Sequence, residues 1–312
     1  MRDMAVTFDV VGIGANSVDY VGVVPDIPSP GAALSKMRLR AHIVACGGQM
    51  ATALATCARL GLRAAYAGAT GDDANGRLVR ETLGGLDLDT SHVVVHEGAN
   101  QFAFILIDER TGERVIFWDR DERLNLDDSE LPADAIRSCR LLHVDDVDHR
   151  AAIAAAAIAR AHGVPVTSDV DRITSRTLDL VGAVTVAIFA EHVPLELAML
   201  AGAASSDVTE ALQSLPRRAG QILCATLGSR GAIALDDQGV HRHDGFRVVA
   251  KDTTGAGDVF RGAFIYARLR GWSLDEQLRF ANAAAAVSCT RLGALASVPS
   301  LEEVEEMMER SE

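Results

Sequence analysis

The sequence predicts an α/β fold in which a mostly parallel central sheet lies between two layers of helices. Short apolar β-type runs alternate with helix-type segments along most of the 312 residues, as expected for parallel strands joined by helical crossovers. Hydrophobic residues make up 48% of the chain, which is ample for a large core. We therefore expect a single α/β domain over residues 1–312.

The first part of the chain supplies alternating strands and helices. Residues 6–13 and 64–67 are apolar and β-type, so both are predicted as buried strands. Residues 49–60 have helical character and stop at Gly61, and residues 75–83 stop at a Gly-Gly pair.

The second part continues the alternation. Strands are predicted at 141–144, 164–168, 183–189 and 222–226. Helices are predicted at 150–162, which is rich in alanine, at 273–291, and from Ser300 onward, where Ser-Leu-Glu-Glu has the form of a capping box.

Two regions break the alternation. Residues 20–24 form a β run directly after the first strand and precede Pro25, Pro28 and Pro30; residues 102–107 and 114–118 flank a hairpin turn at Glu109–Gly112. Because no helices separate these runs, we expect a small extra β sheet built from inserted segments at about 19–45 and 100–118.

Bulk composition excludes several classes of partner. A net charge of −13 argues against binding to nucleic acid or to an anionic membrane surface. No apolar run is long enough to span a bilayer, and the N-terminus lacks the features of a signal peptide. Five scattered cysteines without a Cys-x-x-Cys pattern indicate reduced thiols and a cytoplasmic location.

The run Asp252-Thr253-Thr254-Gly255-Ala256-Gly257-Asp258 precedes an apolar pattern at helical spacing. Small residues let the backbone approach a ligand, and the unpaired N–H groups of a first helical turn bind anions. A carboxylate at Asp258 would be repelled by phosphate unless it accepts a proton from an attacking hydroxyl. The alternative is a glycine turn with an aspartate in the first helical turn, where Asp is common.

Other motifs are weaker. Gly12-Ile13-Gly14-Ala15-Asn16-Ser17 imitates a dinucleotide-binding fingerprint, but its third glycine is a serine and the next segment is β-type rather than helical. No Gly-Lys pair exists, which excludes a P-loop. His241-Arg242-His243-Asp244 lies between two β runs, so a solvated hairpin is favoured over a metal site.

Two separated motifs resemble those of the ribokinase-like, or PfkB, carbohydrate kinases. Residues 252–258 resemble the C-terminal motif of the family, and Cys46–Ala53, continuing to Gly61, resembles its N-terminal motif, in which a Gly-Gly pair leads into a helix. The matching region covers almost the whole chain. The resemblance implies a ribokinase-like three-layer αβα sandwich with a β lid over the sugar site, and often a dimer contact through that lid.

The resemblance also implies roles for individual residues. Asp258 matches the catalytic base, and the three residues before it, Gly255, Ala256 and Gly257, match the anion hole. Sugar-contacting positions are matched by Asn16, Asp19, Gly47, Gly48 and Thr52. Thr52 departs from the family, which usually has an asparagine there, and Asn16 and Asp19 have the alternatives of a turn residue and a surface carboxylate.

Nucleotide and metal positions are matched less completely. Thr226, Gly228 and Asn282 fall on the nucleotide side, although Asn282 has the alternative of an ordinary polar helix position. The Asn-x-x-Glu associated with magnesium is reduced to Glu191, with Asp169 as a possible helper. The loops that hold a monovalent cation in potassium-activated members are matched by Asp252, Thr254, Ser288, Arg291, Gly293 and Ser297.

Together these matches imply an ATP- and Mg²⁺-dependent sugar kinase, with K⁺ as an activator and a homodimer formed through the lid. The expected acceptor is a primary hydroxyl of a small ribose- or fructose-like sugar. An adenosine-like nucleoside kinase is the alternative. A non-catalytic sugar-binding relative is a further alternative, because the Asn-x-x-Glu is lost.

Overall fold

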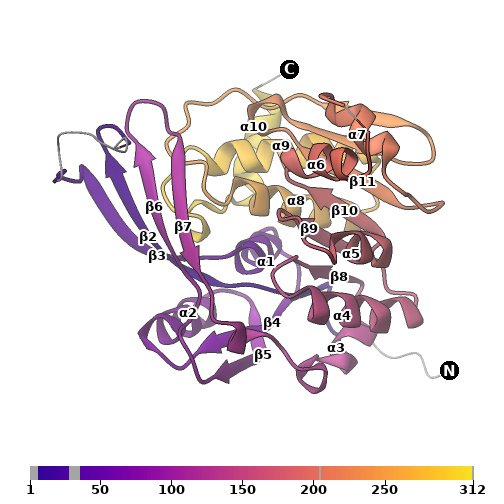
Figure 1. Cartoon of the computed structure of the whole chain (residues 1–312), viewed down its shortest axis with the longest axis horizontal. Coiled ribbons are helices and arrows are strands. Elements are labelled where there is room, and N and C mark those ends of the chain that lie inside the picture. The colour runs from indigo at the N-terminus through magenta and orange to yellow at the C-terminus, as the bar shows by residue number, and fades with distance from the viewer. Residues whose placement is uncertain (1–5, 28–35, 204, 311–312) are drawn as a thin grey trace.

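The computed structural model describes residues 6–27, 36–203 and 205–310. Within these residues a nine-stranded sheet crosses the molecule in the order β13-β12-β11-β10-β9-β8-β1-β4-β5 (Figure 1). From β11 to β5 neighbouring strands are parallel, and β12 and β13 add an antiparallel edge. The strands are β1 Val10–Ile13, β4 Ala64–Gly71, β5 Asp89–His96, β8 Leu141–Val144, β9 Val166–Val170, β10 Val186–Phe189, β11 Ile222–Thr226, β12 Ala232–Leu235 and β13 Val240–His243.

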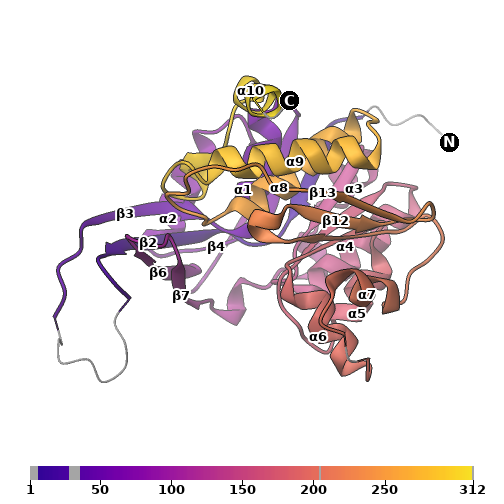
Figure 2. The ribbon, with the colours of Figure 1, turned by 90° about the horizontal axis from the view of Figure 1, so that it is seen from above.

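Helices cover both faces of this sheet (Figure 2). One face carries α1 Gln49–Arg59, α2 Ala74–Gly84, α8 Ala256–Leu269, α9 Leu274–Ser288 and α10 Leu301–Glu309. The other face carries α3 Ala133–Ser138, α4 His149–Ala161, α5 Thr177–Ala183, α6 His192–Leu200 and α7 Val208–Ser214. Each layer buries its own apolar cluster against the sheet, which confirms the predicted three-layer arrangement. Short 3₁₀ turns lie at Glu122–Leu124, Asp128–Glu130, Gly228–Arg230 and Leu295–Ser297.

A separate four-stranded sheet projects from one side of the molecule (Figure 1). Its order is β3-β2-β6-β7, with bounds β2 Ser17–Val24, β3 Ala41–Gly47, β6 Phe102–Asp108 and β7 Arg114–Asp119. This confirms the lid predicted from the helix-free β runs. Pro28 and Pro30 of the expected segment 19–45 lie outside the described residues.

The lid joins the body through very short connections. The chain passes from β1 into β2 through residues 14–16 and from β3 into α1 through Gly48 alone. A strand therefore follows Gly12–Asn16 where a dinucleotide fingerprint would need a helix, and the Rossmann reading fails.

Several predicted boundaries were wrong for identifiable reasons. The first strand begins at Val10 rather than at residue 6, because its pairing with β4 and β8 starts at Val10 and the Asp9 carboxylate accepts from the Arg63 backbone N–H. The strand placed at 164–168 is shifted to Val166–Val170, since Pro165 has no N–H to donate to the sheet. The strand placed at 183–189 starts at Val186 because residues 177–183 form α5.

Other boundaries agree with the sequence or differ at one end. The helix placed at 273–291 ends at Ser288, and the next residues form turns. The Ser300 capping box is present, with the Ser300 hydroxyl accepting from the Glu303 N–H. Among the residues that the structure describes, no helix has the length and hydrophobicity needed to cross a membrane.

Candidate active site

The predicted anion site lies in the first turn of α8. Gly255 precedes the helix with φ 76°, and a Cβ there would lie 2.7 Å from the Ala294 Cβ, so only glycine fits. No side chain caps this helix start. The Ala256 N–H donates to the Thr253 carbonyl at 3.3 Å, so the N–H groups that follow it in the first turn are the ones offered to a ligand. The helix dipole adds positive potential at the same point.

Asp258 lies in this first turn and is only partly exposed. Burial raises the pKa of Asp258 to about 7, while the Arg261 guanidinium acts in the opposite direction. The carboxylates of Asp171, Asp19 and Asp145 add to the rise. A carboxyl group with a pKa near neutrality is suited to accept a proton from a hydroxyl.

Asp252 ties the anion site to the loop that follows α9. One carboxylate oxygen of Asp252 accepts from the Thr254 N–H at 2.8 Å, and the other accepts from the Gly293 N–H at 2.9 Å. The side chain is 2% exposed. Its two hydrogen bonds hold the two loops together beside Gly255.

Asp19 approaches the same region from the start of β2. Its Oδ1 accepts from the Ser17 hydroxyl at 2.9 Å, and its Oδ2 lies 2.3 Å from the position that a Cβ on Gly47 would take. Burial raises the pKa of Asp19 to about 6. Gly47 therefore leaves space for this carboxylate at the junction between the lid and the body.

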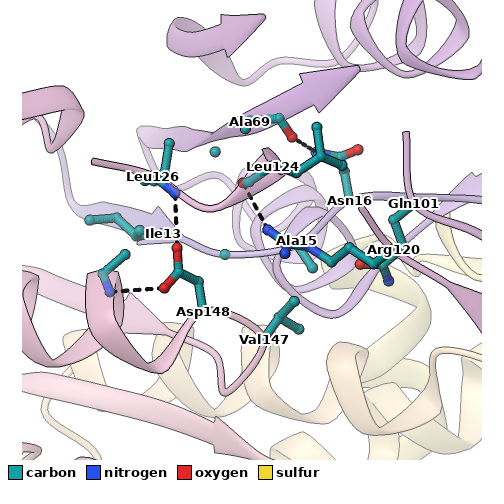
Figure 3. A pocket seen from close by; sticks show the side chains of 13 residues that line it. Ile13, Ala15, Asn16, Ala69, Gln101, Arg120, Leu124, Leu126, Val147 and Asp148 are labelled. Atoms are coloured by element: carbon teal, nitrogen blue, oxygen red, sulfur yellow. Dashed lines mark hydrogen bonds between the residues drawn. The ribbon is translucent and has the colours of Figure 1, made fainter. Parts of the chain in front are cut away.

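Asn16 lies next to Asp19 in sequence, but its polar atoms already have partners. Its amide nitrogen donates to the Tyr66 hydroxyl and to the Ala69 carbonyl, both at 2.8 Å, and its carbonyl accepts from Asn100 at 3.0 Å. Figure 3 shows Asn16 on the wall of a pocket that Arg120 and other residues also line. These bonds make Asn16 a brace for the end of β1, and a contact with an acceptor stays a prediction.

Gly48 and Thr52 place α1 against the site. Gly48 has φ 99°, and a Cβ there would lie 2.5 Å from the Asn16 Cα, which explains the Gly-Gly pair before the helix. Thr52 is fully buried, its Cγ2 lies 3.5 Å from the Cβ position of Gly255, and its hydroxyl has no partner among the described residues.

The lid contacts the body on either side of the site. Arg114 on β7 donates to the Thr253 hydroxyl, just ahead of the anion site. At the other end of β7, the Arg172 guanidinium lies 5.1 Å from the centre of the Trp118 ring. Both contacts bring the lid over the carboxyl ends of the central strands, where ligands bind in open α/β sheets.

A family model described as pfkB family carbohydrate kinase matches residues 8–301. The chain belongs to the pfkB family of carbohydrate kinases. Ribokinase from Haemophilus influenzae is 28% identical to it over 309 residues, covering 96% of this chain and 98% of that protein. A nucleoside kinase from Methanothermobacter thermautotrophicus is 28% identical over 298 residues, covering 93% and 92% of the two chains.

The fold is also similar to that of a solved ribokinase structure. The ribokinase structure from Thermotoga maritima superposes with a TM-score of 0.81 at 24% identity, over 97% of this chain and 99% of that chain. The predicted family and the ribokinase-like fold are confirmed, and the protein is an ATP-dependent carbohydrate kinase.

The residues expected on the nucleotide side of this kinase lie along the far half of the sheet. Thr226 ends β11, and Gly228 follows it in an exposed turn with φ 58°. Asn282 on α9 donates to the His243 carbonyl at 3.0 Å and so supports the loop after β13. This bond favours the ordinary polar role for Asn282, and a nucleotide contact stays a prediction.

Of the residues expected at the metal positions of the kinase, Asp252, Thr254 and Gly293 are brought together, and most of the others have partners outside this group. Glu191 pairs with Arg230, and Asp169 pairs with Arg261 at 2.5 Å. Ser288 and Ser297 each donate to a carbonyl three residues earlier, and Arg291 pairs with Glu303. Magnesium binding at Glu191 or Asp169 would have to compete with these arginines, and it stays a prediction.

His241–His243 do not lie between two strands: they belong to β13, which pairs with β12 in a hairpin whose turn is at residues 236–239, and Asp244 follows the strand. Both ring nitrogens of His241 face carboxylates, Asp236 at 3.1 Å and Asp275 at 3.0 Å. Within the described part of the chain, no cluster of three or more His, Cys, Asp or Glu side chains is arranged to hold a metal ion. The metal reading of this stretch gains no support.

Sequence reasoning missed two residues of the kinase site. Asp145 follows β8, and its carboxylate accepts from the Ala15 N–H at 2.7 Å; a Cβ on Gly14 would collide with it. The signal was a pair of aspartates directly after a buried strand. Arg261 was also missed, although an arginine on the apolar side of a predicted helix is a signal for a buried ion pair.

Proposed function

We propose that this enzyme transfers the γ-phosphoryl group of ATP to a primary hydroxyl of a small sugar, such as a pentose or a ketohexose. The observation that carries the proposal is Asp258, a carboxyl group with a raised pKa in the first turn of an uncapped helix. Asp258 would take the proton of the acceptor hydroxyl, and the N–H groups after Gly255 would stabilise charge on the transferred group. These features also argue against a non-catalytic sugar-binding protein.

The register of the lid places mostly aliphatic side chains on the face that carries Asp19. Asp19 is paired with Ala103 in the sheet, so the two side chains share one face, together with Ile105 and Ile107. Phe102 and Phe104, the aromatic residues of β6, alternate with these and point to the opposite face. Trp118 of β7 is paired with Ala103 and shares this face, so an acceptor beside Asp19 would meet small aliphatic side chains and one exposed indole ring.

A nucleoside acceptor is the second candidate, because one relative of 28% identity is a nucleoside kinase. We also propose that magnesium enters with the nucleotide, held by phosphates and water, since Glu191 and Asp169 are already paired. Cytoplasmic location is consistent with five cysteines that are all free thiols.

A homodimer through the lid is proposed from its exposed apolar residues. Val44, Phe104 and Phe117 are each more than 40% exposed and lie on one face of the lid sheet. Light scattering on the wild type and on Phe117→Asp tests this: a wild-type monomer would contradict it.

The activity is tested by ADP release with ribose, fructose and adenosine, each against a reaction without acceptor. The proposed function predicts higher kcat/KM for one of the sugars, and NMR of the product should place the phosphate on a primary carbon. Faster turnover of adenosine than of any sugar would replace the first candidate with the second. ATP consumption with no acceptor in the panel would reject both.

A further inference from the structure

A buried ion pair lies directly beneath the anion site. Arg261 on α8 is 4% exposed, Asp169 on β9 is 1% exposed, and Nη2 of the arginine lies 2.5 Å from Oδ1 of the aspartate. Arg261 follows Asp258 by three residues, so the two side chains emerge from neighbouring positions on one helical face.

The guanidinium folds back toward the start of α8. Its Nη1 lies 2.6 Å from the position that a Cβ on Gly257 would occupy. This direction is the ordinary one for a long side chain on a helix. Gly257 therefore serves two purposes, because it exposes the backbone to a ligand and leaves room for a positive charge behind it.

A cation at this end of a helix is electrostatically unfavourable by itself, since the dipole is positive there. It is balanced by acidic groups from the strand ends. Those acting on Arg261 are Asp169 and Asp171 from the β9 end, Asp146 from the β8 end, and Asp258 from α8 itself. The other titratable groups near it are His143 on β8, whose pKa burial lowers to about 3, and the buried thiol of Cys224 on β11.

The pair is held by charge and burial more than by a hydrogen-bond network. Among the described residues, the two carboxylate oxygens of Asp169 have no well-aligned hydrogen-bond partner. The same is true of the Nε of Arg261. Removing one member of such a pair leaves an uncompensated buried charge. That charge then interacts more strongly with the next group of opposite sign. For Arg261 that group includes Asp258.

We propose that Arg261, anchored by Asp169, is a positioning residue for phosphoryl transfer whose buried charge keeps the Asp258 carboxylate ionised and adds positive potential beneath the Gly255–Gly257 anion site. The proposal rests on the proposed role of Asp258 as the base. Among the charges with the largest effect on Asp258, Asp19, Asp145 and Asp171 disfavour its ionised form, and Arg261 favours it. Without Arg261, the base would hold its proton at neutral pH.

The test follows the ionisation of Asp258 directly. Carbon-13 NMR of labelled aspartate carboxyl groups, assigned with Asp258→Asn, gives the titration midpoint of Asp258 in the free protein. Arg261→Met should raise this midpoint by about one unit or more. Arg261→Lys, which keeps the charge, should move it less. Arg268→Met is the matched control, since Arg268 is a partly buried arginine two turns further along α8, and it should leave the midpoint unchanged.

Asp169→Asn provides an independent test of the same titration midpoint. It also replaces Arg261→Met if that variant does not fold. This variant leaves Arg261 without its nearest counter-ion, so the Asp258 midpoint should fall instead of rising. The low-pH limb of kcat/KM should move in the same direction as the midpoint in each variant. A purely structural role would lower stability without moving the two midpoints in opposite directions.

The proposal is overturned if Arg261→Met folds and its Asp258 midpoint equals that of the wild type. If Arg261→Met does not fold, the same result in Asp169→Asn overturns it. The NMR measurement needs no acceptor, so it separates this inference from the proposed function. Shifted midpoints in an enzyme that phosphorylates no sugar would support the electrostatic role and reject the sugar kinase assignment. Sugar phosphorylation with unshifted midpoints would support the sugar kinase assignment and reject the electrostatic role of Arg261.

Discussion

Replacing Asp258 with asparagine is expected to inactivate the enzyme and to stabilise it in a pH-dependent way. Folding raises the pKa of Asp258 from its ordinary value of 3.8 to about 7. A group shifted upward contributes its full stability below the unfolded pKa and loses it as the pH rises through the folded value. The wild type therefore loses stability between about pH 4 and pH 7, and Asp258→Asn does not.

The magnitude follows from the size of the shift. About three pKa units at about 1.4 kcal/mol each give about 4 kcal/mol of unfolding free energy at pH 8 as an upper limit. Because water reaches part of the carboxylate, we expect a gain of about 2 kcal/mol at pH 8 and under about 1 kcal/mol at pH 5. Turnover should fall on the order of a hundredfold or more, since the general base is lost.

Urea unfolding at pH 5 and pH 8, followed by tryptophan fluorescence, measures both free energies. Trp272 is a suitable probe, since it packs edge-on against Tyr266 and Phe280 between α8 and α9. Asp87→Asn is the control, because it removes one exposed carboxylate from the surface and should change stability little at either pH. A gain for Asp258→Asn that is equal at the two pH values, or near-normal turnover, would refute the reasoning.

Three further predictions concern the same site. Gly47→Ala should raise the KM for the acceptor at least about tenfold, because the new Cβ would lie 2.3 Å from Oδ2 of Asp19. Gly84→Ala is the control and should be neutral, since a Cβ there has no atom within 4 Å; equal KM values for the two variants would contradict the prediction. The kcat/KM of the wild type should fall about tenfold per unit below about pH 7 as Asp258 becomes protonated, and a profile flat down to pH 5 would exclude this group as the base. Potassium should raise the initial rate over sodium at constant ionic strength, because a cation beside Asp252 would order the loops that its carboxylate joins; a flat response leaves Asp252 as a structural brace.

The sequence predicted most of the scaffold because local signals were strong there. The strands at 141–144 and 222–226 and the helix after Gly48 appear where apolar runs and glycines placed them. The strand β5 was not predicted, since only part of its alternating pattern is buried at the sheet edge.

The partners of polar side chains were much harder to foresee. The amide of Asn16 is engaged by Tyr66 and Ala69, about fifty residues away, so its role as a brace depends on the register of β1 and β4. Arg261 and Asp169 are brought together by the packing of α8 on β9. No local sequence pattern shows that two residues so far apart in the chain will meet. The motif therefore predicted Asp258 but not the buried charge of Arg261.

The short connections between lid and body have an evolutionary consequence. Residues 14–16 and 47–48 adjoin Asp19 and also link the lid to the body, where a hinge would have to bend. A substitution there that selects a new acceptor also changes the stiffness with which the lid is mounted, so substrate choice and the rate of lid opening are inherited together. The hairpin at residues 109–113 neither links the lid to the body nor adjoins Asp19. Divergence toward new acceptors is then expected to proceed through paired changes, one at the hinge and one that restores its mechanics.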